Sequence, residues 1–313
     1  MVSTKPLVSI LVPVYNREGI ISETLSSALS QTYENIEVIV VDNASTDGTW
    51  SVISDYANRD SRVKAFKNES NLGPVRNWLR CVECATGMFA KILWSDDLIS
   101  PDFLEKTIPY FDDPQVGFVY TATKIFTEKP EAGMLSYANG KTGVYDAESF
   151  IQGDFKAKGY PLSPGCAVFY LKDVKSNLML QVPNGIGSDF SMHAIGNDLL
   201  LFLLTANQYK KMAFISDVLS YFRSHSGSIS IESTDGKLPL HYDIARAHFA
   251  ETYRPDLLDI LNVKLFFDLK KYSNSKKFGL ENIADFYVEN KFFKVNFLYA
   301  GMAVASRVLR KFS

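Results

Sequence analysis

Polar and acidic side chains follow three apolar, strand-like runs in the first hundred residues. The first run ends in Tyr15 and Asn16, the second in Asp42, and the third in Asp96 and Asp97. Because open α/β sheets bind ligands at the carboxyl ends of their strands, we expect these side chains to form one site. A carboxylate there can accept hydrogen bonds from a base or a ribose, and adjacent acids can ligate a divalent cation.

Three motifs carry a resemblance to a known family. They read Val-Ser-Ile-Leu-Val-Pro-Val-Tyr-Asn from Val8, Val-Ile-Val-Val-Asp-Asn-Ala-Ser-Thr-Asp-Gly-Thr from Val38, and Trp-Ser-Asp-Asp from Trp94. Their order and spacing resemble the family 2 glycosyltransferases, inverting enzymes with the GT-A fold that use nucleotide-sugars. The resemblance covers residues 6–230 and is strongest through Pro101. It implies transfer of a sugar from a nucleoside diphosphate to a hydroxyl group.

The resemblance implies that the first two strand ends line a nucleoside pocket. Tyr15 can stack on a planar base, while Pro13 and Asn16 shape the loop and offer backbone or amide contacts. Asp42 is expected to bind the base or ribose, and a turn or helix-capping role is its alternative. Arg76 is expected near the base or diphosphate because a planar guanidinium binds oxyanions and stacks on rings. An exposed helical arginine is the alternative for that residue.

Asp96 and Asp97 form the predicted metal and diphosphate site. A divalent ion held by carboxylate and diphosphate oxygens neutralises the charge that develops on the leaving group. Many members of the resembling family carry Asp-x-Asp-Asp here, whereas this chain has Trp94 in place of the first Asp. An indole cannot ligate a metal. We therefore expect Asp97 to ligate Mn²⁺ or Mg²⁺, with Asp96 assisting through a ribose or water-mediated contact.

The resemblance also implies a general base and a second basic motif later in the chain. Family members commonly have Glu-Asp before an apolar helix and then Tyr-x-Arg-x-His; the matching segments here are Asn-Asp, ending at Asp198, and Tyr-Phe-Arg-Ser-His, ending at His225. Asp198 would remove the proton of the acceptor hydroxyl, with Asp189 as the reserve candidate and a plain N-cap as the alternative. Arg223 and His225 are expected near the diphosphate or the metal, with His225 as a ligand or hydrogen-bond donor.

Strands and helices that alternate along the chain must position these residues. The expected strands cover 8–14, 36–41, 63–66 and 89–94, and the expected helices cover 18–31, 46–57 and 74–85, with another starting at a Ser100 cap. This alternation indicates a parallel, doubly wound sheet flanked by helices. Together with the resemblance it predicts an α/β protein of the GT-A class, Rossmann-like and mostly parallel.

The second half of the chain is less regular. Strands are expected at 116–126, 166–171 and 212–221, a loop at 133–143, and an apolar helix at 198–206. Helical spacing from about residue 238 predicts an extension of three or four helices. We therefore expect a catalytic domain over 1–237, with a nucleotide-binding half (6–115) and an acceptor-binding half (116–237), followed by the extension over 238–313. Loops 128–143 and 153–165 are expected to shape the acceptor site.

The composition sets limits on partners and compartment. A formal net charge of −2 over 313 residues gives no general attraction for nucleic acid. Cys81 and Cys84 have the spacing of a redox or zinc pair, but without a second pair we expect inert thiols in a reducing compartment. No signal peptide or membrane-spanning run is visible, so we expect a cytoplasmic protein. The aromatic and basic segment 292–312 is predicted either to lie on the inner face of the cytoplasmic membrane or to pack as a final helix.

The resemblance implies a hexosyl- or N-acetylhexosaminyltransferase with a UDP-sugar donor and a glycan or lipid-linked glycan acceptor, acting in capsule, O-antigen or other bacterial surface polysaccharide synthesis. A nucleotidyltransferase is one alternative, although it would normally have a Gly-rich, basic phosphate loop after the first strand. A non-catalytic nucleotide- or sugar-binding module is another. The presence of Asp97 and Asp198 argues against that module, while Trp94 and Asn197 keep it open.

Overall fold

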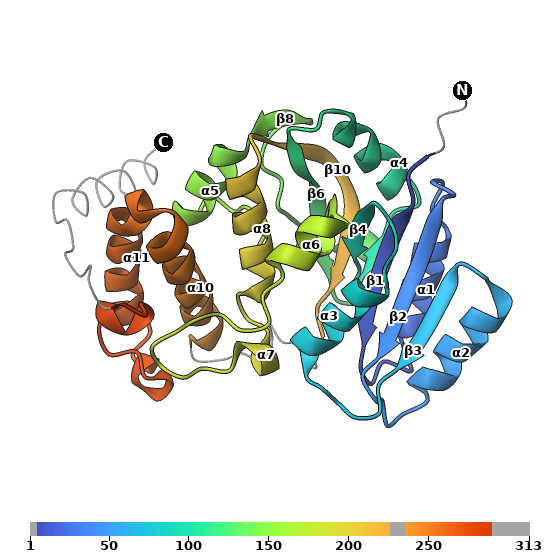
Figure 1. Ribbon diagram of the computed structural model, residues 1–313, viewed down its shortest axis with the longest axis horizontal. Coiled ribbons are helices and arrows are strands. Elements are labelled where there is room, and N and C mark those ends of the chain that lie inside the picture. Colours follow the sequence, from blue (N-terminus) through green and yellow to red (C-terminus); the bar gives the residue numbers. More distant parts are fainter. Residues whose placement is uncertain (1–4, 226–235, 290–313) are drawn as a thin grey trace.

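A mixed sheet of ten strands forms the centre of the computed structural model, which describes residues 5–225 and 236–289 (Figure 1). The strands are β1 (Val8–Val14), β2 (Ile36–Asp42), β3 (Val63–Lys67), β4 (Phe89–Ile92), β5 (Leu98–Ile99), β6 (Val116–Phe126), β7 (Met134–Ser136), β8 (Gly143–Asp146), β9 (Ala167–Tyr170) and β10 (Lys211–Arg223). The α-helices are α1 (Ile21–Leu29), α2 (Thr49–Arg59), α3 (Pro74–Cys84), α4 (Phe103–Thr107), α5 (Ala147–Phe155), α6 (Leu171–Asn177), α7 (Phe190–His193), α8 (Asn197–Gln208), α10 (Lys237–Tyr253) and α11 (Leu258–Lys271).

The first four strands form the predicted parallel half of the sheet, in the order β3-β2-β1-β4. Every residue of β1 and β2 is buried, as their continuous apolar runs predict for strands covered on both faces. Parallel pairing runs from Val8 opposite Ile36 to Val14 opposite Asp42, so both strands end at the same edge. The α/β GT-A architecture predicted from the sequence is confirmed in this half.

The second half adds antiparallel pairings that the sequence did not predict. Strand β9 lies between β4 and β6 and is antiparallel to both, while β10 runs parallel to β6. The segment 133–143, predicted as a loop, contains β7, which pairs with the C-terminal end of β6. Helix α4 starts at Phe103 rather than after a Ser100 cap, because the Ser100 hydroxyl donates to Oδ1 of Asp102 at 2.6 Å and does not accept a backbone N–H of the helix.

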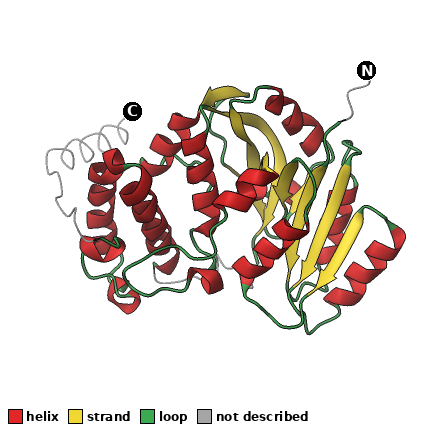
Figure 2. Ribbon diagram, in the orientation of Figure 1, coloured by secondary structure: helices red, strands yellow, loops and turns green. Residues whose placement is uncertain are grey.

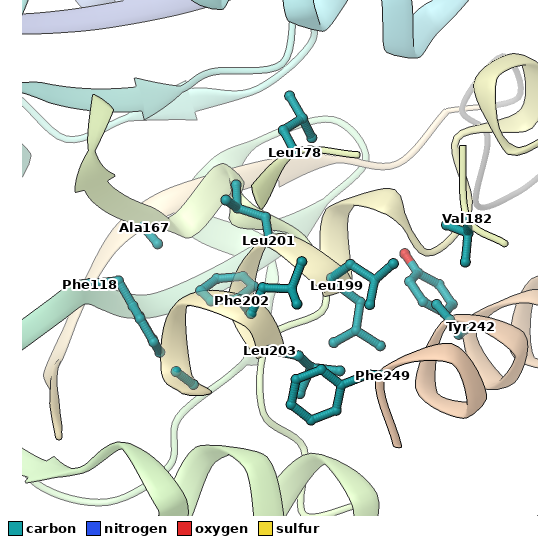
Figure 3. Close-up of a cluster of buried hydrophobic side chains, with 14 of the residues drawn as sticks. Phe118, Ala167, Leu178, Val182, Leu199, Leu201, Phe202, Leu203, Tyr242 and Phe249 are labelled. Atoms are coloured by element: carbon teal, nitrogen blue, oxygen red, sulfur yellow. The ribbon is translucent and has the colours of Figure 1, made fainter. Parts of the chain in front are cut away.

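Helices cover both faces of the sheet (Figure 2). Helices α1, α2 and α4 pack on one face through side chains that include Leu25, Ile53 and Phe103. Helices α3, α5, α6 and α8 pack on the other face, and the same core continues into α10 and α11. Figure 3 shows this continuation, with Phe118 of the sheet and Phe202 of α8 on one side and Phe249 of α10 on the other.

The described part of the extension contains α10, α11 and three short 3₁₀ helices at 255–257, 275–278 and 283–286. Within residues 5–225 and 236–289, no helix is both long and apolar enough to cross a bilayer. The segment 292–312, for which a membrane or packing role was predicted, lies outside the described residues. Cys81 and Cys166 are buried free thiols, and burial raises the pKa of both, which fits the predicted inert role.

Candidate active site

The ends of β1 and β2 lie side by side and position the first group of predicted residues. Pro13 is buried and lies one residue before the end of β1. The pairing of β1 with β4 ends at Leu11, so the N–H that proline lacks is not needed for a hydrogen bond to β4. Asn16 has a left-handed backbone (φ 49°), and its amide oxygen accepts a hydrogen bond from the Thr46 backbone N–H at 2.9 Å. Tyr15 is 40% exposed, so its ring is open to a ligand.

Asp42 is fully buried where β2 ends. Its Oδ1 accepts hydrogen bonds from the backbone N–H and the hydroxyl of Ser45. Among the residues that the structure describes, none donates a hydrogen bond to its Oδ2, which lies 3.9 Å from Nζ of Lys67. Buried carboxylate oxygens are rarely left without a donor, so Oδ2 is an unusual feature of this strand end.

Arg76 lies in the first turn of α3, which begins at Pro74 after Gly73 in a left-handed conformation (φ 83°). Its Nη1 donates to Oγ of Ser191 at 2.9 Å, and this hydroxyl donates to Oδ1 of Asp189 at 2.6 Å. The structure therefore groups Arg76 with Asp189, the reserve base candidate, which is itself occupied as the N-cap of α7.

Asp96 and Asp97 lie at the C-terminal end of β10. They come directly before β5, which starts at Leu98 and pairs antiparallel with β10. The backbone N–H of Arg223 donates to Oδ1 of Asp97 at 2.9 Å, and its Nε donates to the Asp96 carbonyl at 3.1 Å. Nε2 of His225 lies 2.8 Å from Oδ2 of Asp96. The contacts thus bring together four predicted residues that are far apart in the sequence.

Asp97 is almost completely buried, at 5% exposure. Burial above all, and the neighbouring Asp96 carboxylate, raise its pKa well above the usual range. Lys91 is fully buried on β4, and burial lowers its pKa to about 7. A divalent cation would favour the ionised form of Asp97. Within the part of the chain that the structure describes, no group of three or more His, Cys, Asp or Glu side chains is arranged to hold a metal ion.

Trp94 stands where many members of the resembling family carry the first acid of the motif. Its ring packs against Trp78, with centroids 4.6 Å apart, and its Nε1 donates to Oγ of Ser163 at 2.8 Å. A Cβ added at Gly165 would come within 3.0 Å of the indole. Trp94 is partly exposed and lies two residues before Asp96 in the chain. This chain thus has an aromatic side chain at the position where many members of the resembling family have a carboxylate.

Asp198 lies in the first turn of α8 and is 7% exposed. Its Oδ1 accepts hydrogen bonds from the backbone N–H groups of Gly196 at 3.0 Å and Leu199 at 2.9 Å. Its Oδ2 accepts one from the Tyr242 hydroxyl at 2.8 Å. Burial raises the pKa of Asp198 to about 6, against the lowering effect of these hydrogen bonds. A carboxylate with a pKa near neutrality suits a general base.

Sequence reasoning missed three residues that contact the predicted set. Arg17 lies 3.9 Å from Oδ2 of Asp96 through its Nη2, and Glu23 accepts a 2.6 Å hydrogen bond from Nη2 of Arg223. Arg17 follows Asn16 directly, so its place at a strand end was a usable signal. Glu23 on α1 and Tyr242 on α10 carry no comparable signal, because each reaches the site from a helix.

Known proteins resemble this chain in sequence. The sequence profile described as "Glycosyl transferase family 2" matches residues 9–175. An uncharacterized glycosyltransferase of Haemophilus influenzae is 34% identical over 139 residues, 44% of this chain and 42% of that protein. The Escherichia coli UDP-Glc:alpha-D-GlcNAc-diphosphoundecaprenol beta-1,3-glucosyltransferase WfaP is 34% identical over 145 residues, 42% of this chain and 57% of WfaP. The chain thus spans about half the length of these relatives.

Solved structures share the fold. Residues 1–349 of S. aureus TarS in complex with UDP-GlcNAc superpose with a TM-score of 0.63, at 19% identity, over 88% of this chain and 75% of that chain. The overlap extends beyond the matched segment 9–175 into the second half of the chain, so the mixed sheet is shared as well as its parallel half.

Proposed function

This chain belongs to glycosyl transferase family 2, and from that premise we propose that it is an inverting glycosyltransferase. It moves a sugar from a nucleoside-diphosphate sugar, with UDP as the favoured nucleotide, to a hydroxyl of a glycan or lipid-linked glycan. The name of WfaP, which gives UDP-Glc and a GlcNAc-diphosphoundecaprenol, supports this choice of donor and acceptor. The biological setting is bacterial surface polysaccharide synthesis.

One observation carries the proposal: Asp96 and Asp97 contact Arg223 and His225 at the edge where the parallel strands end. Carboxylates, a guanidinium and an imidazole at this edge are the groups that a nucleoside diphosphate and its cation require. Oδ2 of Asp42, which accepts no hydrogen bond from the described residues, adds an acceptor for the base or ribose, and exposed Tyr15 adds a stacking surface.

The residues present fit a divalent cation that shares its coordination with the donor. Mg²⁺ is commonly bound by one or two carboxylates together with substrate phosphates, so an incomplete protein cage is expected. Asp97 and His225 would hold the ion, and Asp96 would assist. When bound, the ion offsets the negative charge that develops on the leaving diphosphate. Arg17 and Arg223 lie around the same acidic pair and are placed to bind phosphate oxygens.

Asp198 is proposed as the general base. It accepts the proton of the acceptor hydroxyl while the oxygen attacks the anomeric carbon on the face opposite the nucleotide. The new carbon–oxygen bond forms as the bond from the anomeric carbon to the β-phosphate oxygen breaks. The electron pair of that bond leaves with the nucleoside diphosphate, and the configuration at the anomeric carbon inverts.

The proposal is tested by calorimetric titration with UDP, GDP, CDP and dTDP, each with and without Mn²⁺. We expect one nucleotide to bind in a Mn²⁺-dependent manner, and the Asp97→Ala variant to lose that dependence. Asp55→Ala, which removes an exposed carboxylate on α2, is the matched control. Absence of binding by every nucleotide would favour a non-catalytic module.

Transfer is tested separately, with Asp198→Asn and Asp189→Asn as a matched pair. The first variant should bind nucleotide normally and lose transfer, because an amide cannot accept the proton. The second should retain transfer, because Asp189 caps α7 and bonds to Ser191. The reverse result would move the base to Asp189.

A further inference from the structure

The helical extension contributes a buried hydroxyl to the candidate active site. Helix α10 packs against α8, and its Tyr242 projects toward the start of α8, where Leu199 lies (Figure 3). The Tyr242 hydroxyl donates to Oδ2 of Asp198 at 2.8 Å. Tyr242 is 9% exposed and Asp198 is 7% exposed, so both groups are largely removed from water.

The two oxygens of Asp198 have different partners. Oδ1 accepts two backbone N–H groups at the start of α8, from Gly196 and Leu199, whereas Oδ2 accepts only the Tyr242 hydroxyl among the described hydrogen bonds. A carboxylate offers about four lone-pair positions. Oδ2 therefore keeps a lone pair that could accept a further proton. The hydrogen bond from Tyr242 fixes the rotation of the carboxylate, and this rotation sets the direction of that lone pair.

The surroundings keep Tyr242 protonated as a donor. Burial above all, and the Asp198 carboxylate, raise the pKa of Tyr242 well above its usual value. Among the described residues, the other ionisable groups that act on this pair include Tyr137, from the loop after β7, and Arg246, one turn further along α10. Tyr137 is half-buried, and desolvation raises the pKa of its hydroxyl as well. Arg246 is held by Asp154 and Asp243.

We propose that Tyr242 is a positioning residue that orients the Asp198 carboxylate and favours its ionised form. The inference rests on the proposed function, in which Asp198 is the general base. A phenylalanine at this position would fill the same space in the core. The hydroxyl is therefore needed only for its hydrogen bond to the carboxylate, and the extension becomes part of the catalytic apparatus rather than an appended support.

The test compares Tyr242→Phe with the parent and with Tyr287→Phe. The control removes a buried hydroxyl of the same extension, which donates to Oδ1 of Asn262 at 2.7 Å. None of the described hydrogen bonds joins it to Asp198. Three measurements are made: the pH profile of UDP release from the donor that the parent uses, UDP affinity by calorimetry, and the ¹³C carboxyl titration of Asp198, assigned with Asp198→Asn.

We expect Tyr242→Phe to raise the carboxyl pKa and the acidic limb of the profile by about one pH unit, the effect of losing one hydrogen bond to a charged group. Its kcat should fall about tenfold in the pH-independent region, with UDP affinity unchanged. Tyr287→Phe, which also loses one buried hydrogen bond, should leave the carboxyl pKa of Asp198 and the acidic limb of the pH profile unchanged.

The outcomes separate this inference from the function it rests on. If the parent turns over and Tyr242→Phe has the same acidic limb and carboxyl pKa, the positioning role is refuted while the glycosyltransferase stands. If Asp198→Asn transfers at the parental rate, the base assignment fails and the inference fails with it. Equal shifts in Tyr242→Phe and Tyr287→Phe would also overturn the inference, because they would show a general effect of loosening the extension.

Discussion

Arg246 on α10 joins the extension to the sheet-bearing part of the chain, and its removal should unfold the protein at a markedly lower temperature. Its Nε and Nη2 each donate to Asp154 of α5 at 2.8 Å, and its Nη1 donates to Asp243 at 2.9 Å. The Asp154 and Asp243 side chains are 2% and 0% exposed. The perturbation is Arg246→Leu, which keeps the apolar stem and removes the charge.

The expected cost follows from what each carboxylate loses. Asp243 keeps Lys264 at 2.6 Å, whereas the described structure gives Asp154 no other ion pair. Breaking a buried pair by removing one partner costs about 3–5 kcal/mol, because the remaining charge stays buried without compensation. At about 2–4 °C per kcal/mol, the melting temperature should fall by roughly 6–20 °C.

Denaturant and thermal unfolding of three variants measure this cost. Arg59→Leu, which removes an exposed ion pair of α2, should match the parent. The double variant Arg246→Leu with Asp154→Leu should recover most of the loss, because replacing both charges with apolar groups is often neutral. A loss below about 1 kcal/mol for Arg246→Leu, or no recovery in the double variant, would refute the reasoning that the pair is a buried, mutually dependent unit.

Three further predictions follow from single side chains. Transfer should fall about tenfold per pH unit below pH 6, because Asp198, with a pKa of about 6, must be ionised to accept a proton; a flat profile from about pH 5 to 7 would contradict the base assignment. Burial raises the pKa of Glu37, but hydrogen bonds from Lys64, Ser9 and Thr86 lower it to about 2. The ionised Glu37 therefore contributes fully to the free energy of unfolding above about pH 4.5, and this contribution is lost as the pH falls toward 2. Acid titration of unfolding should show a loss of about 2 kcal/mol in that window, and Glu37→Gln should show little of it. Asp42→Asn should weaken nucleotide binding about tenfold in calorimetry, because an amide offers one acceptor oxygen instead of two; unchanged affinity would leave Asp42 a turn residue.

The parallel half of the sheet was predictable because its signals are local. Continuous apolar runs and the polar residues after them predicted β1, β2 and β4 to within a few residues, and Pro74 marked the start of α3. The strand-end rule then grouped Asp42, Asp96 and Asp97 at one edge. Helices α5, α6 and α7 were not predicted, because their apolar spacing is short and interrupted.

Helix α10 shows why the extension was harder to read. Every residue from Leu240 to Ala250 is buried, including Asp243, Arg246 and His248. In a sequence, a charged residue normally indicates the exposed face of a helix. Such a side chain is buried only where an oppositely charged partner offsets the free-energy cost of removing it from water. That partner, Asp154, lies 92 residues away.

The family, the parallel strands and the residues at their ends can be recognised from the amino-acid sequence, because apolar runs and their polar termini are encoded by neighbouring residues. Which distant groups meet depends on the tertiary structure. Arg223 reaches Asp97 across 126 positions through the pairing of β5 with β10, and Tyr242 reaches Asp198 through the packing of α10 on α8. Such contacts depend on strand register and helix packing over the whole core, and no local pattern specifies either.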